Sequence, residues 1–177
     1  ISVARLVKVK CMDLLIEAFA RTFKGEEKIR LTIVGDGPER KGLQHQIDQL
    51  GLQNQVHLTG FLPSDKVAEM LKQSNCFVSA SNLETFGVPW IEAWCCGLPV
   101  IGAENGPIDS FFTPENSRKF VANDVESLQA AMVQIYTDRN TFDSGQIATK
   151  AYSQFGEEAV VNQLMNVFST NDGQVTI

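Results

Sequence analysis

The sequence has no stretch of about 20 residues without a charged side chain, and it contains neither a CxxC pair nor a cluster of Lys and Arg. The first absence argues against a membrane-spanning helix, which needs about 20 mostly apolar residues. Without a basic cluster, and with a net charge of −6, nucleic-acid binding has little support. Only 13 Gly and 6 Pro occur among 177 residues, of which 44% are hydrophobic, so we expect one folded domain rather than a disordered chain.

The four cysteines have no spacing typical of a disulfide framework or a zinc site. Cys11, Cys76, Cys95 and Cys96 lie in apolar segments, so we interpret them as small hydrophobic side chains and predict no metal. Because no secretory signal is present either, we expect a reducing, cytoplasmic location. The chain starts at Ile1, inside a pattern typical of a buried strand, which we interpret as a fragment cut at a domain boundary.

Strand-like and helix-like patterns alternate along the chain about five times. This predicts an α/β domain over residues 1–170, Rossmann-like, with three α/β/α layers around a parallel sheet, and a loose polar tail over 171–177. The expected strands are 1–6, 29–34, 56–58, 76–80, 98–102 and 119–122. The expected helices are 13–23, 38–50, 64–73, 88–96, 125–136, 141–152 and 157–168.

Local signals indicate where some helices begin and end. Pro38 suits the first position of the second helix, and Ser64 is expected to cap the third. Gly51 and Gly97 stand just beyond two helix ends, where glycine is favoured. In an open parallel sheet, ligands bind outside the carboxyl ends of the strands. The loops to consider therefore follow Leu6, Val34, Leu58, Ala80 and Gly102.

Glu92 is the only charged residue between Val88 and Ile101. A lone carboxylate in an apolar helix is costly unless it finds solvent or hydrogen-bond donors. One interpretation is a helix edge turned to solvent, or a partner inside the protein. The other is a carboxylate that accepts hydrogen bonds from the hydroxyls of a ligand, such as a ribose diol. The residues alone favour neither.

Glu84 stands eight positions before Glu92, in the polar loop that precedes the helix. Eight helical residues would separate the two carboxylates by about 12 Å, at about 1.5 Å per residue. That separation is too long for an acid and base acting on one bond, but it suits two ends of an extended ligand. An ordinary loop residue is the simpler interpretation of Glu84.

The segment Gly35-Asp36-Gly37 is a strand-to-helix turn, where backbone can approach a phosphate or a sugar. The signal is weak because such turns favour glycine, and both the GxGxxG fingerprint and the P-loop are absent. Asp36 and Glu39 would also repel a phosphate placed on that helix terminus.

Three cations, Arg5, Lys8 and Lys10, cluster at the end of the first expected strand. Arg and Lys at such a loop can hold a diphosphate, although surface charge is the commoner role. His45 and His57 have no ligand spacing, and we assign neither a function.

Several motifs follow one another in a recognisable order. They are Ala4-Arg5-Leu6 with Lys10, Val34 to Arg40 (VGDGPER), Gly60-Phe61, Glu84 to Glu92 with an E-x7-E spacing, and Cys96 to Ile101 (CGLPVI). Together they closely resemble the C-terminal, donor-binding domain of GT-B fold glycosyltransferases of the family 4 (group 1) type. The resemblance runs from Ser2 to about Phe168.

This resemblance implies a nucleotide-diphosphate sugar as donor substrate, no cofactor or metal, and transfer with retention of configuration. It implies three catalytic residues: Arg5 and Lys10, which would hold the diphosphate and neutralise its charge as it leaves, and Glu84, which would meet the sugar hydroxyls. Glu92 would accept hydrogen bonds from the ribose hydroxyls. The other residues implied in donor binding are Gly35, Gly37, Phe61, Leu62, Thr85, Phe86, Gly87 and Val88.

The sequence departs from the family pattern at four places. Ala4 and Cys11 stand where the family has glycine, Thr85 replaces a commoner glycine, and Asn105 to Asp109 replaces a GG-x-PE run. We expect the larger side chains at positions 11 and 85 to narrow the donor pocket.

The acceptor-binding N-terminal domain of the family has no room in this chain. We therefore expect a donor module, inactive alone, from a hexosyltransferase that acts on a glycan, lipid or other acceptor, as in cell-surface glycan biosynthesis. The helices from Thr141 onward are expected to leave an apolar face for the missing domain. Peripheral association of the parent protein with the inner face of a membrane is a further expectation. The alternatives are a non-catalytic nucleotide-binding module and a nucleotide-sugar epimerase, while an NAD-dependent oxidoreductase would need the absent fingerprint.

Overall fold

The computed structural model describes residues 1–84, 87–104 and 110–170. Six short strands lie in this part of the chain, all paired in parallel within two three-stranded sheets ordered β1-β2-β3 and β4-β5-β6. The strands are β1 (Ser2–Val3), β2 (Leu31–Val34), β3 (Val56–Gly60), β4 (Phe77–Val78), β5 (Val100–Ala103) and β6 (Ser117–Phe120).

Backbone hydrogen bonds join the two sheets beside β1 and β4. The amide of Val78 donates to the carbonyl of Ile1 at 2.9 Å, and the ammonium of Ile1 donates to the carbonyl of Cys76 at 2.9 Å. The strands therefore run in the order β3-β2-β1-β4-β5-β6, and the direction of chain progression reverses between β1 and β4. In an open α/β sheet, this reversal is the topological switch point where ligands bind.

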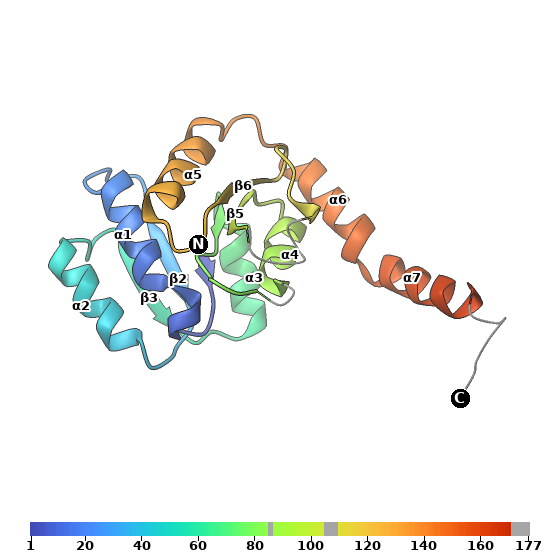
Figure 1. The fold of residues 1–177 in the computed structure, drawn as a ribbon, viewed down its shortest axis with the longest axis horizontal. Helices are drawn as coiled ribbons and strands as arrows, with labels where there is room; N and C mark the ends of the chain where they lie inside the picture. Colours follow the sequence, from blue (N-terminus) through green and yellow to red (C-terminus); the bar gives the residue numbers. More distant parts are fainter. Residues whose placement is uncertain (85–86, 105–109, 171–177) are drawn as a thin grey trace.

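Helices cover both faces of the sheet. The helices α1 (Met12–Phe23), α2 (Arg40–Leu50) and α5 (Val125–Thr137) bury apolar residues in one core cluster and are grouped along one side of the molecule in Figure 1. The helices α3 (Ser64–Lys72), α4 (Val88–Cys95) and α6 (Ser144–Phe155) contribute to a second cluster. A parallel sheet needs cover on both faces, and the predicted three-layer α/β/α class is confirmed.

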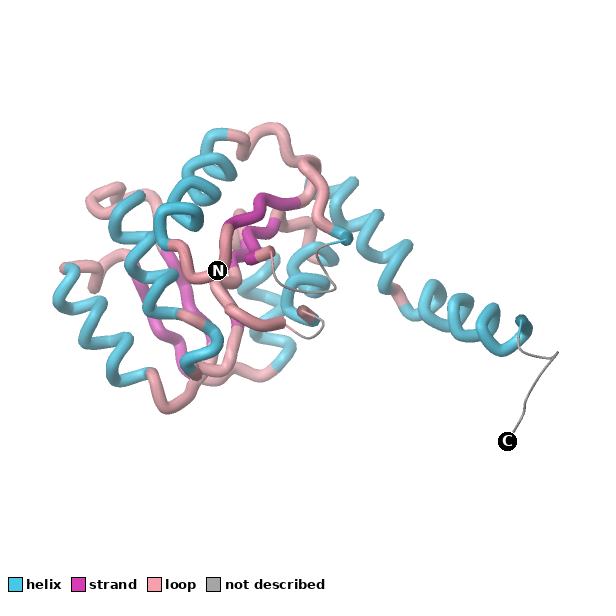
Figure 2. Tube along the Cα trace, in the orientation of Figure 1, coloured by secondary structure: helices cyan, strands magenta, loops and turns pink. Residues whose placement is uncertain are grey.

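The last helix, α7 (Glu157–Thr170), contacts α6 and extends away from the body of the domain (Figure 2). Val160, Val161 and Met165 are exposed along it, with 42%, 50% and 59% of their surface open to solvent. No helix in the described ranges is both long and apolar enough to cross a bilayer.

One predicted helix start and one predicted helix cap are wrong. Pro38 lies in a turn with Glu39, and α2 begins at Arg40. The backbone amide of Glu39 donates to the carbonyl of Leu6 at 3.1 Å, outside the helix. Ser64 is the first residue of α3 rather than its cap; Pro63 precedes it in an extended conformation, with no side-chain hydrogen bond at the cap. The predicted helix ends at Gly51 and Gly97 are confirmed, with φ values of 68° and 76°.

The first strand is shorter than expected, at Ser2–Val3 instead of 1–6. The following residues still run beside β2, since Ala4 donates to the carbonyl of Val34 at 3.0 Å and Leu6 donates to the carbonyl of Asp36 at 2.9 Å. The pairing therefore continues past the strand and into the first loop. The tail 171–177, expected to be loose, lies outside the described residues.

Candidate functional site

The loops after β1, β2, β3 and β4 emerge at the carboxyl edge of the sheet, around the switch point. They carry Arg5 and Lys10, Gly35 and Gly37, Phe61 and Leu62, and Glu84. Gly87, Val88 and Glu92 follow at the start of α4. Thr85 and Phe86 lie outside the described residues, as do Asn105 to Asp109, where the sequence differs from the family pattern.

Lys10 and Glu84, which are 74 residues apart in the sequence, form an ion pair at this edge. The Nζ atom of Lys10 donates to Oε1 of Glu84 at 2.7 Å, and the two side chains are 23% and 11% exposed. This contact was not anticipated, because each residue was expected to serve a different part of a ligand. The structure thus places the predicted ammonium and the predicted carboxylate in one cluster.

The backbone holds the same two loops together. The carbonyl oxygen of Val9 accepts a hydrogen bond from the amide of Asn82 at 2.9 Å, and the hydroxyl of Ser81 lies 3.3 Å from the same oxygen. Sequence reasoning did not single out Ser81 or Asn82, and the available signal was only their position just after β4. Together with the ion pair, these bonds connect the β1–α1 loop to the β4–α4 loop.

Gly35 and Gly37 are required by the fold itself. Gly35 has a φ of 136°, and a Cβ atom there would lie 1.9 Å from the carbonyl oxygen of Ala4. A Cβ atom on Gly37 would lie 2.3 Å from the carbonyl oxygen of Leu6. These glycines therefore let the segment carrying Arg5, which is exposed, pass directly over the end of β2. Their predicted contact with a donor remains a prediction.

Cys11 occupies the left-handed conformation, with φ 47° and ψ 45°, where the family pattern has glycine. Its thiol turns back into its own loop, 3.4 Å from the carbonyl oxygen of Lys8 and 3.6 Å from that of Val9. Burial is the main cause that raises the pKa of this thiol above its ordinary value of 9.0.

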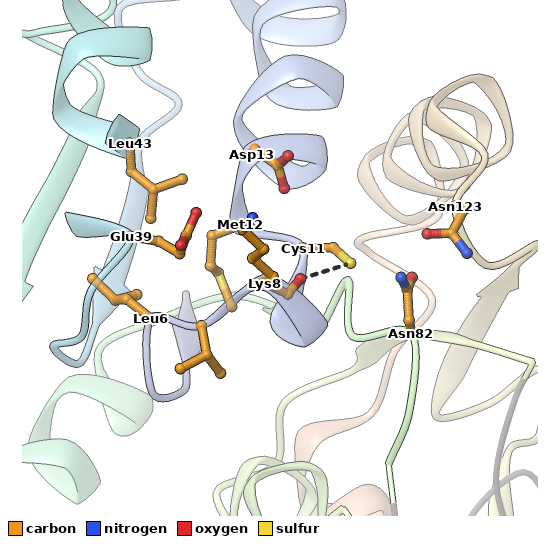
Figure 3. A pocket seen from close by; sticks show the side chains of 10 residues that line it. Leu6, Lys8, Cys11, Met12, Asp13, Glu39, Leu43, Asn82 and Asn123 are labelled. Atoms are coloured by element: carbon orange, nitrogen blue, oxygen red, sulfur yellow. Dashed lines mark hydrogen bonds between the residues drawn. The ribbon is translucent and has the colours of Figure 1, made fainter. Parts of the chain in front are cut away.

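A cavity of about 300 Å³ lies beside Cys11, between the β1–α1 loop, α2 and the loops near Asn82 and Asn123 (Figure 3). Its lining includes Asn82, whose Oδ1 atom is buried without a hydrogen-bond partner among the described atoms, but none of Arg5, Lys10 and Glu84. The side chain of Cys11 thus lies on this cavity, and the expected narrowing of the donor pocket by Cys11 stays a prediction.

Phe61 and Leu62 lie just beyond β3 and differ in burial. The ring of Phe61 is 78% exposed, while Leu62 is partly buried against the core formed by α3 and α4. The amide of Gly35 donates to the carbonyl of Gly60 at 2.9 Å, so the exposed ring stands next to the Gly35 turn.

Glu92 lies on α4 and is exposed, whereas Trp90, Ala93 and Trp94 form the buried face of this helix. Its carboxylate therefore carries no large desolvation cost and is open to solvent. Because α4 begins only at Val88, with Gly87 at its cap position, Glu84 is not part of this helix, and the 12 Å separation that assumed a continuous helix does not apply. Gly87, with φ 78°, is at the cap position before α4, where no side chain makes a capping hydrogen bond, and Val88 is 53% exposed.

The four cysteines are free thiols, and within the described ranges no three His, Cys, Asp or Glu side chains are grouped as a metal site. His45 and His57 are exposed on α2 and β3. The charged groups that the structure gathers at the switch point are thus Lys10 and Glu84, with Arg5 close by in the sequence.

The fold and these loops define a class: a Rossmann-like α/β domain with Arg and Lys on the loop after β1 and a Glu pair around the start of α4. The chain belongs to the family of glycosyl transferases group 1, whose sequence pattern matches residues 1–159.

Individual relatives fit this assignment. The 2-deoxystreptamine N-acetyl-D-glucosaminyltransferase of Niallia circulans is 29% identical over 150 residues, which are 83% of this chain and 39% of that protein. The N-acetyl-alpha-D-glucosaminyl L-malate synthase of Bacillus anthracis is 28% identical over 171 residues, 95% of this chain and 44% of that protein. The chain therefore spans less than half the length of these two relatives.

Solved structures agree on the fold. HepE from Anabaena, crystallised in complex with UDP, matches with a TM-score of 0.84 at 24% identity, over 96% of this chain and 48% of that one. The sucrose-phosphate synthase of Thermosynechococcus elongatus matches with a TM-score of 0.81 at 23% identity, over 96% of this chain and 44% of that one.

Proposed function

We propose that this chain is the donor-binding domain of a retaining, family 4 type glycosyltransferase, which transfers a sugar from a nucleotide-diphosphate sugar to a glycan, lipid or other acceptor. The observation that carries the proposal is the convergence of Lys10 and Glu84 at the switch point of a chain that belongs to the glycosyl transferases group 1. A diphosphate needs cations, and a sugar needs a hydrogen-bond acceptor for its hydroxyls, and this edge offers both.

In this proposal, Arg5 and Lys10 bind the diphosphate and stabilise its negative charge as the bond to the sugar breaks. The uncapped N-terminus of α4 adds a partial positive charge beside them. Glu92, exposed on the same helix, accepts hydrogen bonds from the ribose, and Phe61 offers its exposed ring to the base. Neither a metal nor a cofactor takes part.

The acceptor site belongs to a second domain in this proposal. Support comes from length, since the chain covers 39% and 44% of the two curated relatives described above. The apolar residues exposed on α7, Val160, Val161 and Met165, give that domain a surface to pack on. The isolated chain would then bind the donor without transferring the sugar, and measurable transfer by these 177 residues alone would contradict this part.

UDP is the first ligand to test, because HepE was crystallised with UDP and with UDP-glucose. We would titrate the chain with UDP, GDP, ADP and NAD by calorimetry, with and without magnesium. One nucleoside diphosphate should bind, independently of magnesium, and NAD should not.

A pair of matched variants tests the assignment of the site. Glu92→Ala should weaken binding of that nucleotide, while Glu26→Ala, which changes an exposed carboxylate in the turn after α1, should leave it unchanged. The absence of binding by all three nucleoside diphosphates would contradict the proposed function.

A further inference from the structure

The Lys10–Glu84 pair differs from the other ion pairs of the described chain. Glu84 is 11% exposed, whereas the carboxylate side chains of Asp138, Glu17 and Glu69 in the other pairs are 32%, 36% and 58% exposed. The Glu17 and Glu69 pairs lie within single helices, but Lys10 and Glu84 come from different loops. Glu84 is thus the most buried of the paired carboxylates.

Such a pair stabilises both partners only while they face each other. If a diphosphate draws the ammonium of Lys10 away, the carboxylate of Glu84 is left in a largely buried place without its cation. The same carboxylate also repels the negative charge of a diphosphate that approaches Lys10. The ion pair therefore competes with a nucleoside diphosphate for Lys10.

The two loops do not have to separate for this exchange. The hydrogen bond from the amide of Asn82 to the carbonyl of Val9 holds their backbones together at 2.9 Å. Rotation of the two side chains is enough to break the contact of 2.7 Å between Nζ and Oε1. The competition therefore involves a movement of the two side chains, while the backbones of the two loops stay in place.

We propose that Glu84 makes the site discriminate between the whole sugar nucleotide and the nucleoside diphosphate that remains after transfer. This inference rests on the proposed function, in which the sugar hydroxyls lie at Glu84. When a sugar nucleotide binds, the hydroxyls replace the ammonium as donors to the Glu84 carboxylate, and Lys10 turns to the diphosphate. After the sugar has been transferred, the Glu84 carboxylate pairs with Lys10 again, and the affinity of the site for the remaining nucleoside diphosphate falls.

The decisive measurement is the affinity of UDP, which has no sugar, for the Glu84→Gln variant. Because glutamine removes both the competition for Lys10 and the repulsion, we expect UDP to bind about tenfold more tightly than to the wild type. In the Lys10→Met background, Glu84→Gln should change the affinity for UDP much less. Glu17→Gln, which removes an exposed carboxylate paired with Arg21 on α1, is the matched control and should leave UDP affinity unchanged.

Each other result has a definite meaning. Unchanged UDP affinity in Glu84→Gln would show that Glu84 serves only the sugar, and weaker binding would show that it positions Lys10; both would overturn the proposal. A wild type that binds no nucleoside diphosphate would instead contradict the proposed function itself. Thermal unfolding of every variant shows whether it is folded, and Glu84→Ala, which also removes the carboxylate, replaces Glu84→Gln if that variant does not fold.

The second arm uses whichever of UDP-glucose and UDP-N-acetylglucosamine the wild type binds more tightly. The wild type should bind this donor more tightly than UDP, and the ratio of the two dissociation constants should fall towards one in Glu84→Gln. A wild type that binds UDP as tightly as both donors would overturn the discrimination that we propose.

Discussion

The amino and carboxyl edges of the sheet differ in the charged side chains that they bring together, and the volume of a cavity does not show this difference. At the amino edge, near Ile29 to Thr32 and Asn75 to Cys76, lies a hollow of about 610 Å³, lined by aromatic and aliphatic side chains, polar residues and the cations Lys28, Arg30 and Arg139. At the carboxyl edge, loops bring Lys10 and Glu84 together at 2.7 Å. The lining of the cavity at the amino edge includes no carboxylate among the described residues. At the carboxyl edge, by contrast, a positive and a negative side chain are in contact.

In this parallel α/β sheet, the contact between opposite charges is made by the loops of the carboxyl edge and not in the larger of the two cavities described above. At the carboxyl edge, the glycines 35 and 37 let one loop lie on another, so side chains from distant segments meet. At the amino edge, Arg139 instead contacts a residue only three positions away in the sequence. Its guanidinium lies 4.4 Å from the ring centroid of Tyr136 and donates a hydrogen bond to the Tyr136 carbonyl at 2.7 Å. The predictions below test this difference.

The largest expected effect concerns the close backbone approach at the carboxyl edge. Gly35→Ala should lower the free energy of unfolding by about 3 kcal/mol or more, because the new Cβ would lie 1.9 Å from the carbonyl oxygen of Ala4. Gly42→Ala is the control, since nothing lies within 4 Å of a Cβ there, and it should gain about 0.5–1 kcal/mol in helix α2. Urea unfolding measures both, and equal effects would refute the argument.

The next effect separates the edges by ligand binding. Arg5→Ala at the carboxyl edge should weaken UDP binding about tenfold, the usual scale of a lost charged hydrogen bond. Arg30→Ala, an exposed arginine that lines the hollow at the amino edge, should leave UDP affinity unchanged. Calorimetric titration compares the two variants. If only Arg30→Ala weakened UDP binding, the ligand would lie at the amino edge, which would contradict our proposal.

A double-mutant cycle then measures the contact between the loops. For Lys10→Met and Glu84→Gln we expect a coupling of about 1 kcal/mol or more in the free energy of unfolding, because the pair is largely buried. The same cycle on the exposed Arg21–Glu17 pair of α1 should give about 0.3–0.5 kcal/mol. A coupling near zero for the loop pair would mean that it is not formed in solution.

The smallest expected effect is a pH dependence at the amino edge. Burial raises the pKa of the Cys76 thiol from 9.0 to about 11, so the folded state keeps a proton that the unfolded state releases first. The stabilisation is therefore complete below pH 9 and is lost as the pH rises through about 11. Urea unfolding at several pH values should show this decline, and Cys76→Ala should make it less steep, whereas an identical slope in the variant would contradict the assignment.

Much of the fold could be predicted because strands and helices leave local patterns. The helix α5 was expected at 125–136 and is found at Val125–Thr137, since its apolar positions repeat with helical period. The start of α2 was wrong by two residues, and Ser64 is the first residue of α3 rather than its cap, because Glu39 and Pro63 stand at the cap positions and neither helix begins with a capping side-chain hydrogen bond. The candidate site residues were chosen by motif and by strand end, and the contact between Lys10 and Glu84 was not predicted.

The sequence by itself determined the alternation of strands and helices, the edge at which a ligand can bind, and the identity of Arg5, Lys10, Glu84 and Glu92 as its candidate charges. Periodicity and glycine punctuation are local properties, so they can be read along the chain. Only the tertiary structure decided that Lys10 meets Glu84 across 74 residues. It also decided that Glu92 faces solvent, and that Gly35 and Gly37 make room for the chain's own first loop. Such contacts depend on how the loops pack in space, because distances between segments far apart in sequence are set by the assembled core and not by local pattern.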